Sequence, residues 1–520
     1  MTQPEYKKEV DNWVDAHIDQ MLEDLKTLVR IPSIRGEAKE GMPYGEMPAK
    51  AVCAMQKLME QYGLHATNYE NYCVAGDLDA EGKKALDILA HLDVVPVSDS
   101  WTKTAPFDPL VLGDRIYGRG TIDDKGPAIA ALYAMRCIRE LGLPLKYGVR
   151  LICGSDEECG SSDLEYYYSR EKEALYTFSP DADYPLINIE KGRLQKSFRA
   201  TGSAVDEDAL GRDDVNQDVV DSEKKAHVKC IRVGSAANIV PGTGTMILTG
   251  VSEEMLHSAA EKMQEAAGEL ISWSKQGEDY VVTASGRSSH AAHPVGGINS
   301  VTLILELLKQ LDRNCAAGGN ALFSSDGMWS GRNDAPGENM LLRIGSLWPH
   351  GEFHGESLEV NYSDEESGAL TMSLDVLDYR MKEDGRFFEL QGTFDCRAPL
   401  CCNDGNLTQK IHEKLEAAGL EMEDGPMVHG HYVSAESVLV KKLLESYELY
   451  FEEKGTTIAI GGGTYVHELE RGVAFGCADL EVDNHMHGDD EFMEIPMLVR
   501  STKVFADAIM RLCGRVCLES

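Results

Sequence analysis

The chain has 520 residues, and its 87 Asp and Glu residues outnumber its 50 Lys and Arg residues, which gives a net charge of −37. This excess argues against binding to DNA, RNA or an anionic membrane, because each of these partners requires a positive protein face. No apolar run approaches the ~18 residues of a membrane span, and the opening residues lack a signal-peptide pattern. The 13 cysteines contain no C-x-x-C pair and indicate a reducing compartment. We therefore expect a cytoplasmic protein without nucleic-acid or membrane partners.

The first 190 residues alternate between helical and strand-like segments. Residues 10–29 and 49–62 carry apolar side chains at helical spacing, so each segment is expected to form an amphipathic helix. Residues 85–90 and 147–153 are short apolar runs that end in polar residues, as buried strands do. The alanine-rich segment 126–141 between them is predicted to be a helix. This alternation indicates an α/β fold with a mostly parallel sheet and helices on both faces.

The composition changes in the middle of the chain. Residues 201–226 are charged and hold few large apolar side chains, so we expect a solvated loop there. From about residue 230 to residue 433, strands of alternating polarity are separated by helices such as 253–270 and 301–311. That pattern is typical of an α+β domain.

A strand pair followed by a helix is predicted twice in this middle region, at residues 228–267 and 370–418, which indicates a duplicated unit. After it the first pattern returns, with a helix at 439–454, a strand at 457–460 and a final helix at 495–512. We therefore expect one α/β domain interrupted by an inserted α+β domain.

Polar clusters follow the predicted strands, which is where α/β folds place ligand sites. His91 and Asp93 are two residues apart after the first strand, so on an extended chain their side chains point the same way. A carboxylate in this position can orient an imidazole that binds a metal. A hydrogen-bonded surface pair is the alternative.

Two further clusters are rich in acidic residues. Asp123 and Asp124 stand directly before the predicted helix 126–141, where they are either ligands or N-terminal caps of that helix. Asp156, Glu157 and Glu158 follow the second strand. Like charges so close together repel one another unless a cation neutralises them or water solvates them.

Asp181 and Asp183 form a fourth cluster, and two histidines, His485 and His487, stand in an acidic segment near the end of the chain. Both histidines can face a metal, or the segment can be a surface loop. Taken together, the clusters supply the imidazole and carboxylate ligands that suit a divalent transition metal. They are numerous enough to hold two ions.

These clusters resemble the metal-site motifs of a known family. The matching segments are HLDVVP, GRGTIDDKGP, SDEECGSSD, SPDADYP and a final histidine followed by Asp and Glu, in that order. They look like the motifs of the dinuclear metallopeptidases that include carboxypeptidase G2, aminoacylase, acetylornithine deacetylase and carnosinase. The SPDADYP and GGGTYV segments and the chain length most resemble the PepV-type dipeptidases.

The resemblance implies a role for each matching residue around two divalent metal ions, with zinc expected first and manganese or cobalt as alternatives. It implies that His91 and Asp181 bind one ion, that Glu158 and His487 bind the other, and that Asp123 bridges both. It further implies that Asp93 orients His91 and that Glu157 is the general base. It also implies a cis peptide bond between Asp123 and Asp124.

The resemblance extends to the inserted domain, which it implies is a ferredoxin-like lid. His290 would polarise the scissile carbonyl, and Asn238 and Arg397 would contact the substrate. From the residues alone, His290 and His293 would be helix-entry residues and Arg397 a surface strand arginine. The loop of Gly462, Gly463 and Thr464 would lie against the substrate carboxylate. His467 stands near a position where these relatives carry an arginine, which affects the expected substrate preference.

We therefore expect a catalytic metal-binding domain of residues 1–188 and 434–520 and a lid of residues 189–433. The implied reaction is metal-dependent hydrolysis of the amide bond of dipeptides, by a metal-activated water with Glu157 as general base. An N-acyl amino acid deacylase and an inactive peptide- or metal-binding protein are the alternatives. The long lid favours a monomer over a dimer.

Overall fold

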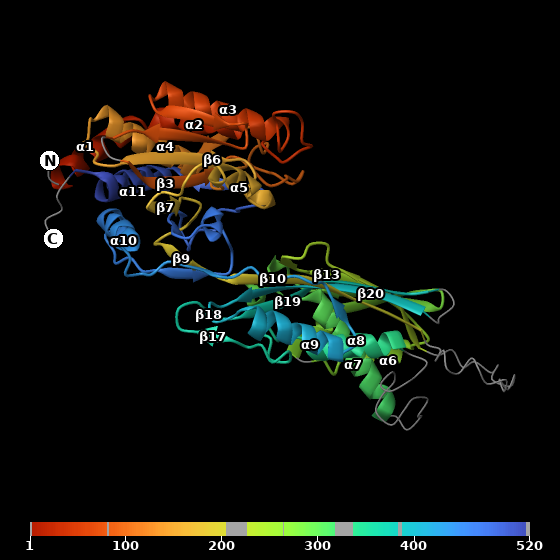
Figure 1. The fold of residues 1–520 in the computed structure, drawn as a ribbon. Helices are drawn as coiled ribbons and strands as arrows, with labels where there is room; N and C mark the ends of the chain where they lie inside the picture. The colour runs from red at the N-terminus through yellow and green to blue at the C-terminus, as the bar shows by residue number, and fades with distance from the viewer. Residues whose placement is uncertain are drawn as a thin grey trace, which may run out of the picture. The chain divides into compact units, whose positions relative to one another are not determined.

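The computed structural model describes residues 3–80, 83–203, 226–263, 265–317, 336–382 and 387–515. The chain divides into two compact units, a first unit of residues 1–190 and 431–520 and a second unit of residues 191–430 (Figure 1). The acidic loop predicted at 201–226 lies almost entirely outside the described residues. Within these described ranges, no helix is both long enough and apolar enough to cross a membrane.

The first unit is built around a mixed sheet with helices between its strands. Its elements are α1 (Gln3–Ala16), α2 (Ile18–Val29), α3 (Glu46–Gln61), β1 (His65–Tyr69), β2 (Cys73–Leu78), β3 (Lys84–His91), β4 (Leu110–Leu112), β5 (Arg115–Tyr117), α4 (Lys125–Glu140), β6 (Gly148–Gly154), η1 (Glu157–Cys159), α5 (Ser162–Tyr168), β7 (Tyr176–Ser179), β8 (Ala182–Asp183), β9 (Ile187–Glu190), β22 (His431–Tyr432), α10 (Val438–Phe451), β23 (Ile458–Ile460), η6 (Tyr465–Glu468), β24 (Gly472–Ala474), β25 (Cys477–Ala478), β26 (Phe492–Glu494) and α11 (Ile495–Cys513).

The strand order in the main sheet of this unit is β1-β2-β6-β3-β7-β24-β9-β22, and β23 also pairs with β9. The central strands β6, β3, β7 and β24 run parallel, while β1, β2 and β22 are antiparallel to their neighbours. Side chains alternate between the faces: Ile88 and Ala90 join the large helix-covered core, whereas Leu89 packs beside α5 and η6. The predicted α/β fold with helices on both faces is confirmed.

The helix predicted at residues 10–29 is interrupted at His17, where α1 ends and α2 begins. The backbone of His17 lies outside the helical region, at φ −113° and ψ 8°. Its ring hydrogen-bonds back to the carbonyl of Trp13 at 2.6 Å and stacks on the Trp13 ring. Apolar spacing does not reveal this break because both helices bury the same kind of face.

The second unit contains an eight-stranded antiparallel sheet in the order β14-β15-β13-β11-β19-β20-β10-β21. Its elements are β10 (Gly192–Ser203), β11 (His227–Val233), β12 (Ile239–Val240), β13 (Thr243–Thr249), α6 (Glu253–Ala260), η3 (Glu265–Leu270), β14 (Ile271–Gln276), β15 (Asp279–Ser285), β16 (Ser289–His290), η4 (Pro294–Gly296), α7 (Ser300–Ala317), α8 (Pro336–Leu347), β17 (Ser363–Asp364), β18 (Gly368–Ala369), β19 (Thr371–Met381), β20 (Phe387–Ala398), η5 (Asp404–Thr408), α9 (Gln409–Ala417) and β21 (Glu421–Met422).

Each half of this sheet contains a strand pair followed by a helix and an edge strand, β11-β13-α6-β14 in one half and β19-β20-α9-β21 in the other. The helix predicted at residues 253–270 is shorter than expected, because α6 stops at Ala260 and a separate short 3₁₀ helix, η3, follows. Gly268 of η3 comes so close to Ala260 that a Cβ at this glycine would lie 2.1 Å from the Ala260 carbonyl oxygen. A glycine at this position therefore lets η3 pack closely against the end of α6.

Asp375 is a buried acid in the second unit that makes its stability depend on pH. Burial, reinforced by Asp395, outweighs the lowering effects of Ser373 and Arg397 and raises the pKa of Asp375 from 3.8 to about 8. The folded protein therefore holds this proton more tightly than the unfolded chain does. The resulting stability is present at acidic pH and is lost as the pH rises from 3.8 to about 8.

Replacing Asp375 with asparagine is expected to raise the melting temperature at alkaline pH, because the variant has no charge to bury there. Melting curves of the metal-free protein at about pH 5 and about pH 8.5 measure the effect, which should appear mainly at the higher pH. Asp378→Asn, an exposed position on the same strand, is the matched control. A gain of equal size at both pH values would contradict the titration of Asp375.

Candidate active site

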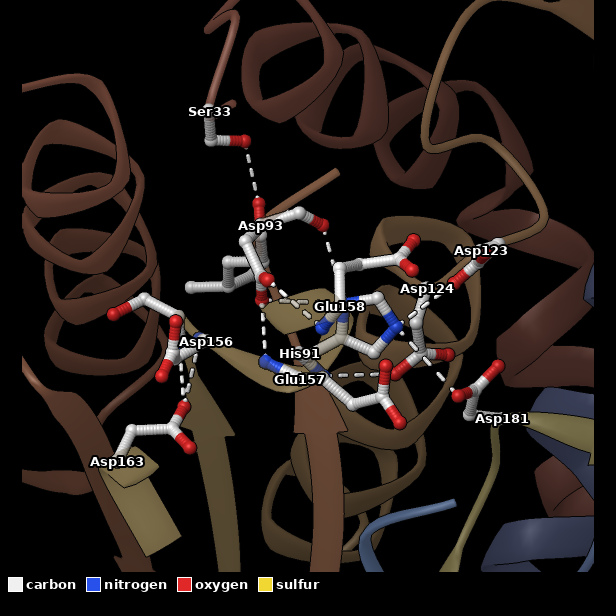
Figure 2. Close-up of polar contacts among 12 residues, drawn as sticks. Ser33, His91, Asp93, Asp123, Asp124, Asp156, Glu157, Glu158, Asp163 and Asp181 are labelled. Carbon is white, nitrogen blue, oxygen red and sulfur yellow. Dashed lines mark hydrogen bonds and ion pairs between the residues drawn. The ribbon is translucent and has the colours of Figure 1, made fainter. Parts of the chain in front are cut away.

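The predicted site residues of the first unit gather where three parallel strands end. His91 is the last residue of β3, Glu157 and Glu158 follow β6, and Asp181 follows β7. These strands are neighbours in the sheet, so their carboxyl ends open on the same edge. Asp123 comes from the turn before α4. Figure 2 shows Asp123 and Asp181 on the same side of the His91 ring.

Asp123 lies between two histidines that are nearly 400 positions apart in the sequence. Its Oδ1 is 2.8 Å from Nε2 of His91, and its Oδ2 is 2.7 Å from Nε2 of His487. His91 Nε2 is also 3.6 Å from Asp181 Oδ2, and His487 Nε2 is 3.3 Å from Glu158 Oε1. One carboxylate thus contacts two separate pairs, each made of one histidine and one acid. The peptide bond between Asp123 and Asp124 is cis, as the resemblance implies.

The donor atoms of this cluster fit metal ions. His91 Nε2 and Glu158 Oε1 are buried and make no directed hydrogen bond within the described residues. His91, Glu157 and Asp181 form one group whose ligand atoms all lie within 4.8 Å of one another, and His91, Asp123 and Glu158 form a second. Imidazole nitrogens and carboxylate oxygens at this spacing are suitable ligands for zinc, manganese or cobalt.

Burial is the largest cause of the pKa shifts of Glu157, Glu158 and Asp181, and neighbouring charges add to it. Burial raises the pKa of Glu157 well above its ordinary value, and burial together with Asp123 raises that of Glu158 to about 7. Burial also raises the pKa of Asp181. Burial acts in the same direction on Asp123, but His487 and His91 outweigh it and lower the Asp123 pKa. Positive ions would remove this mutual repulsion of the carboxylates.

The tautomer of His91 is fixed by its surroundings. Its Nδ1 lies 3.1 Å from the backbone carbonyl of Asp93, and because a carbonyl only accepts, Nδ1 donates. In the neutral ring the Nε2 lone pair is then available to a metal. The Asp93 carboxylate oxygen Oδ1 is farther from Nδ1, at 3.4 Å. Asp124 Oδ2 accepts a hydrogen bond from the His91 backbone N–H at 2.9 Å, so Asp124 does not cap α4 with its side chain.

Asp93 has a second contact that its sequence spacing does not reveal. Its two carboxylate oxygens accept the backbone N–H groups of Glu157 and Glu158, at 3.2 and 3.1 Å. These two glutamates lie in the 3₁₀ turn η1 and not on an extended chain, so alternation along a strand does not explain how their side chains diverge. Asp93 instead ties the turn that carries both glutamates to the end of β3.

Asp156 and Asp163 lie away from the ligand cluster, on the opposite side of His91 in Figure 2. Asp156 accepts hydrogen bonds from the Arg35 guanidinium and the Ser162 hydroxyl. Asp163 accepts the backbone N–H groups of Ser155 and Asp156. These contacts shape the turn before Glu157, and sequence analysis missed them because a buried acid and a solvated one look alike in a sequence.

Tyr465 completes this support from a distant segment. Its hydroxyl donates to Asp163 at 2.6 Å, and its ring stands edge-on to the His91 ring with the centroids 6.2 Å apart. Gly154, the last residue of β6, leaves room for the contact, because a Cβ there would lie 2.0 Å from the Tyr465 hydroxyl oxygen and 2.3 Å from Asp163 Oδ2.

Replacing Gly154 with alanine should therefore displace Tyr465 from Asp163 and destabilise the protein by about 1–3 kcal/mol, as overpacking does. Thermal unfolding measures the loss. Gly36→Ala is the control, because a Cβ at Gly36 would meet nothing nearer than 3.9 Å. Equal melting temperatures for the two variants would show that the turn does not depend on the close approach at Gly154.

Only one of the two histidines near the chain end contacts the ligand cluster. The Nδ1 of His485 donates to the backbone carbonyl of Asp489 at 2.9 Å, whereas His487 reaches Asp123 and Glu158.

The two acids that follow in the chain, Asp489 and Asp490, accept hydrogen bonds from the segment 98–103. Asp489 accepts the Ser98 hydroxyl, and Asp490 accepts the Thr102 backbone N–H and hydroxyl and the Lys103 N–H.

Three predicted contacts lie in the second unit. Asn238 is exposed in the turn before β12, and its carbonyl accepts the Ala291 N–H. His290 is on β16, and its Nδ1 accepts the Ala292 N–H at 3.1 Å, which puts the proton of the neutral ring on Nε2. Arg397 is buried on β20 and not a surface residue; its guanidinium grips the Asp395 carboxylate at 2.6 and 3.1 Å.

The glycine loop after β23 is held by Glu190, the buried last residue of β9. Thr464 donates to Glu190 Oε1 through its hydroxyl at 2.9 Å and through its backbone N–H at 3.2 Å. His467 Nδ1 lies 3.0 Å from Glu190 Oε2, and a Cβ at Gly463 would lie 3.6 Å from the same oxygen. Gly462 has more space, since a Cβ there would meet only Ile460, at 3.8 Å. The Thr464 N–H already has an acceptor within the protein.

Known proteins resemble this chain over nearly its whole length. The protein YtjP of Bacillus subtilis is 31% identical over 499 residues, which cover 95% of this chain and 97% of YtjP. The Beta-Ala-Xaa dipeptidase of Lactobacillus delbrueckii subsp. lactis is 30% identical over 502 residues, which cover 96% of this chain and 97% of that protein.

The fold is shared with solved structures of low sequence identity. Human carnosine dipeptidase 1 aligns with a TM-score of 0.53 at 15% identity, over 97% of this chain and 99% of that one. The dipeptidase Dug1p of Saccharomyces cerevisiae aligns with a TM-score of 0.53 at 13% identity, over 97% of this chain and 98% of that one. Residues 88–511 match the family described as Peptidase family M20/M25/M40. The chain therefore belongs to peptidase family M20/M25/M40.

Proposed function

We propose that this peptidase hydrolyses the amide bond of dipeptides at a site for two divalent metal ions. The observation that carries the proposal is the position of Asp123, whose two oxygens contact one histidine each. We assign one ion to His91 and Asp181, the other to Glu158 and His487, and the bridging position to Asp123. Residues 1–188 and 434–520 then form the catalytic domain and residues 189–433 the lid.

When bound, the two metal ions supply the positive charge that acidifies a water molecule and polarises the scissile carbonyl. Glu157 accepts a proton from the attacking water as the new C–O bond forms. The same carboxyl then delivers this proton to the amide nitrogen as the C–N bond breaks, so that the products are two amino acids. Burial raises the Glu157 pKa, which makes this carboxylate a stronger base than a solvated glutamate.

Residues of the second unit are proposed to hold the substrate. His290 has its proton on Nε2, which makes that nitrogen a hydrogen-bond donor for the carbonyl oxygen as negative charge develops on it. Arg397 is suited to the C-terminal carboxylate of the substrate, because a guanidinium grips carboxylates at two points. Asp395 keeps its plane fixed. Asn238, Gly462, Gly463 and Thr464 complete the proposed contacts.

The test compares three substrate types under one set of conditions. Dipeptides, including β-alanyl dipeptides such as the Lactobacillus relative's name describes, should be hydrolysed. Dipeptides with an amidated C-terminus should show a raised KM, because they lack the carboxylate that Arg397 is proposed to bind. N-acetyl and N-succinyl amino acids should be poor substrates. A preference for N-acyl amino acids would identify a deacylase, and dipeptide binding without turnover would identify a binding protein.

The remaining assignments concern the environment of the enzyme. Zinc is proposed as the metal, with manganese or cobalt as alternatives, since such ligand sets accept all three. Eleven of the 13 cysteines are seen as free thiols, which supports a reducing, cytoplasmic location. We propose a monomer, with a dimer as the alternative, and light scattering coupled to gel filtration distinguishes them.

A further inference from the structure

A buried ion pair joins the segments that carry Asp123 and His487, and the sequence motifs assigned neither of its residues a role. Arg119 is 2% exposed, Glu491 is 0% exposed, and Nη1 of Arg119 is 2.5 Å from Oε2 of Glu491. The two residues are 372 positions apart in the chain. Arg119 belongs to the turn that leads to Asp123, and Glu491 to the loop that follows His487.

Glu491 organises the turn that carries Asp123. Its second oxygen, Oε1, accepts backbone N–H groups from Gly120 at 3.0 Å, from Ile122 at 3.1 Å and from Asp123 itself at 3.4 Å. Its backbone carbonyl accepts the Gly118 N–H at 3.0 Å. The carboxylate and the backbone carbonyl of Glu491 together therefore hold the backbone of the turn from Gly118 to Asp123, the residue that contacts both histidines.

Arg119 organises the loop that carries His487. Its Nη2 donates to the backbone carbonyls of His487 at 3.0 Å and Gly488 at 2.9 Å. The guanidinium also faces the Trp101 ring, 5.5 Å from its centroid. Because a planar guanidinium donates in fixed directions, the carboxylate of Glu491 and the two carbonyls are held in a defined relation to one another.

The loop around His487 needs such support more than the strand around His91 does. His485, His487 and Asp490 all adopt positive φ angles, between 59° and 61°, which non-glycine residues seldom adopt. The His487 side chain is 54% exposed, whereas that of His91 is 0% exposed, and His91 is itself part of a strand with neighbours on both sides. The hydrogen bonds from Arg119 therefore contribute to placing the backbone of His487.

We infer that Arg119 and Glu491 are positioning residues that set the distance between Asp123 and His487, and thereby the affinity for the metal ion that His487 binds. This inference rests on the proposed two-metal function. Neither residue belongs to the candidate ligand groups found among the described residues. Groups that orient a ligand in this way typically change metal affinity by about 10–100-fold when they are altered.

The test is a Co²⁺ titration followed by absorption and calorimetry on the full chain. Wild type is expected to bind two equivalents, and His487→Ala identifies which of them involves His487. Arg119→Lys keeps the charge beside Glu491 but cannot span the carboxylate and both carbonyls, so it should weaken that one equivalent by about 10–100-fold. The other equivalent should stay unchanged, and excess Co²⁺ should restore kcat.

Arg115→Lys is the matched control. Arg115 also pairs with a glutamate, Glu494, which is in the same chain segment as Glu491, at a distance of 3.2 Å. The Arg115 side chain is 39% exposed, however, and this pair joins only β5 to β26. We expect this variant to bind both equivalents as wild type does. If Arg119→Lys does not purify as a folded protein, Glu491→Gln, which keeps one oxygen acceptor, replaces it.

The outcomes separate the inference from the proposed function. If wild type binds fewer than two equivalents, the two-metal function is wrong. If wild type binds two and Arg119→Lys binds both with unchanged affinity, or weakens both equally, the positioning role is wrong. A lower melting temperature with normal metal binding would likewise show that the pair only stabilises the fold.

Discussion

Replacing Glu157 with glutamine is expected to lower kcat for dipeptides by about 10²–10⁴-fold, the usual contribution of a general base. Glutamine has nearly the same shape but cannot accept the proton of the attacking water. Because Glu157 is not among the residues assigned to either ion, both metal ions should remain bound. KM should change little, since the substrate contacts are made by other residues.

The measurement is steady-state kinetics together with the metal content of the same preparation. Glu165→Gln is the matched control, since Glu165 is an exposed acid on α5 close to the same turn. It should keep wild-type activity. Full activity in a folded, metal-loaded Glu157→Gln enzyme would exclude Glu157 as the general base. Glu158 would then be the next candidate for that role.

Replacing Asp123 with asparagine is expected to have the larger effect, because both proposed ions lose the carboxylate that they share. The variant should retain at most one weakly bound ion and lose more activity than the about 10²–10⁴-fold that removal of a general base costs. Excess metal should not restore activity. Metal analysis after gel filtration, with kinetics in a metal series, measures both effects.

Asp183→Asn provides the comparison for that experiment. Asp183 lies two residues after Asp181 and is only partly buried, and none of the described ligand groups includes it. This variant should bind metal as wild type does. Two tightly bound ions in Asp123→Asn would contradict the bridging assignment, whatever the remaining activity.

Residues that follow strands in a recognisable order could be placed from the sequence. His91 directly follows an apolar run, Glu158 and Asp181 come a few residues after the strands β6 and β7, and parallel strands bring such positions to one edge of a sheet. The order of the elements similarly indicated an α/β fold with an inserted α+β part. These features depend on residues that are close together in the chain, so periodicity and motif spacing can predict them.

Contacts between distant segments could not be placed in the same way. Nothing in the turn around Arg119 indicates that its partner is Glu491, and nothing near Asp163 points to Tyr465. The break at His17 depends on one side chain that bonds back to the preceding helix. Such contacts depend on the folded chain and leave no spacing signal. These long-range contacts hold the segments that carry the site residues, and they involve the candidate ligands themselves less often.

The central claim is that Asp123 lies between two metal ions, and anomalous diffraction from crystals grown with zinc or manganese tests it most directly. Two peaks are expected about 3.5–4 Å apart. One should lie beside His91 and Asp181 and the other beside Glu158 and His487, with an oxygen of Asp123 next to each. A single peak, or a second peak away from Asp123 and His487, would contradict the account.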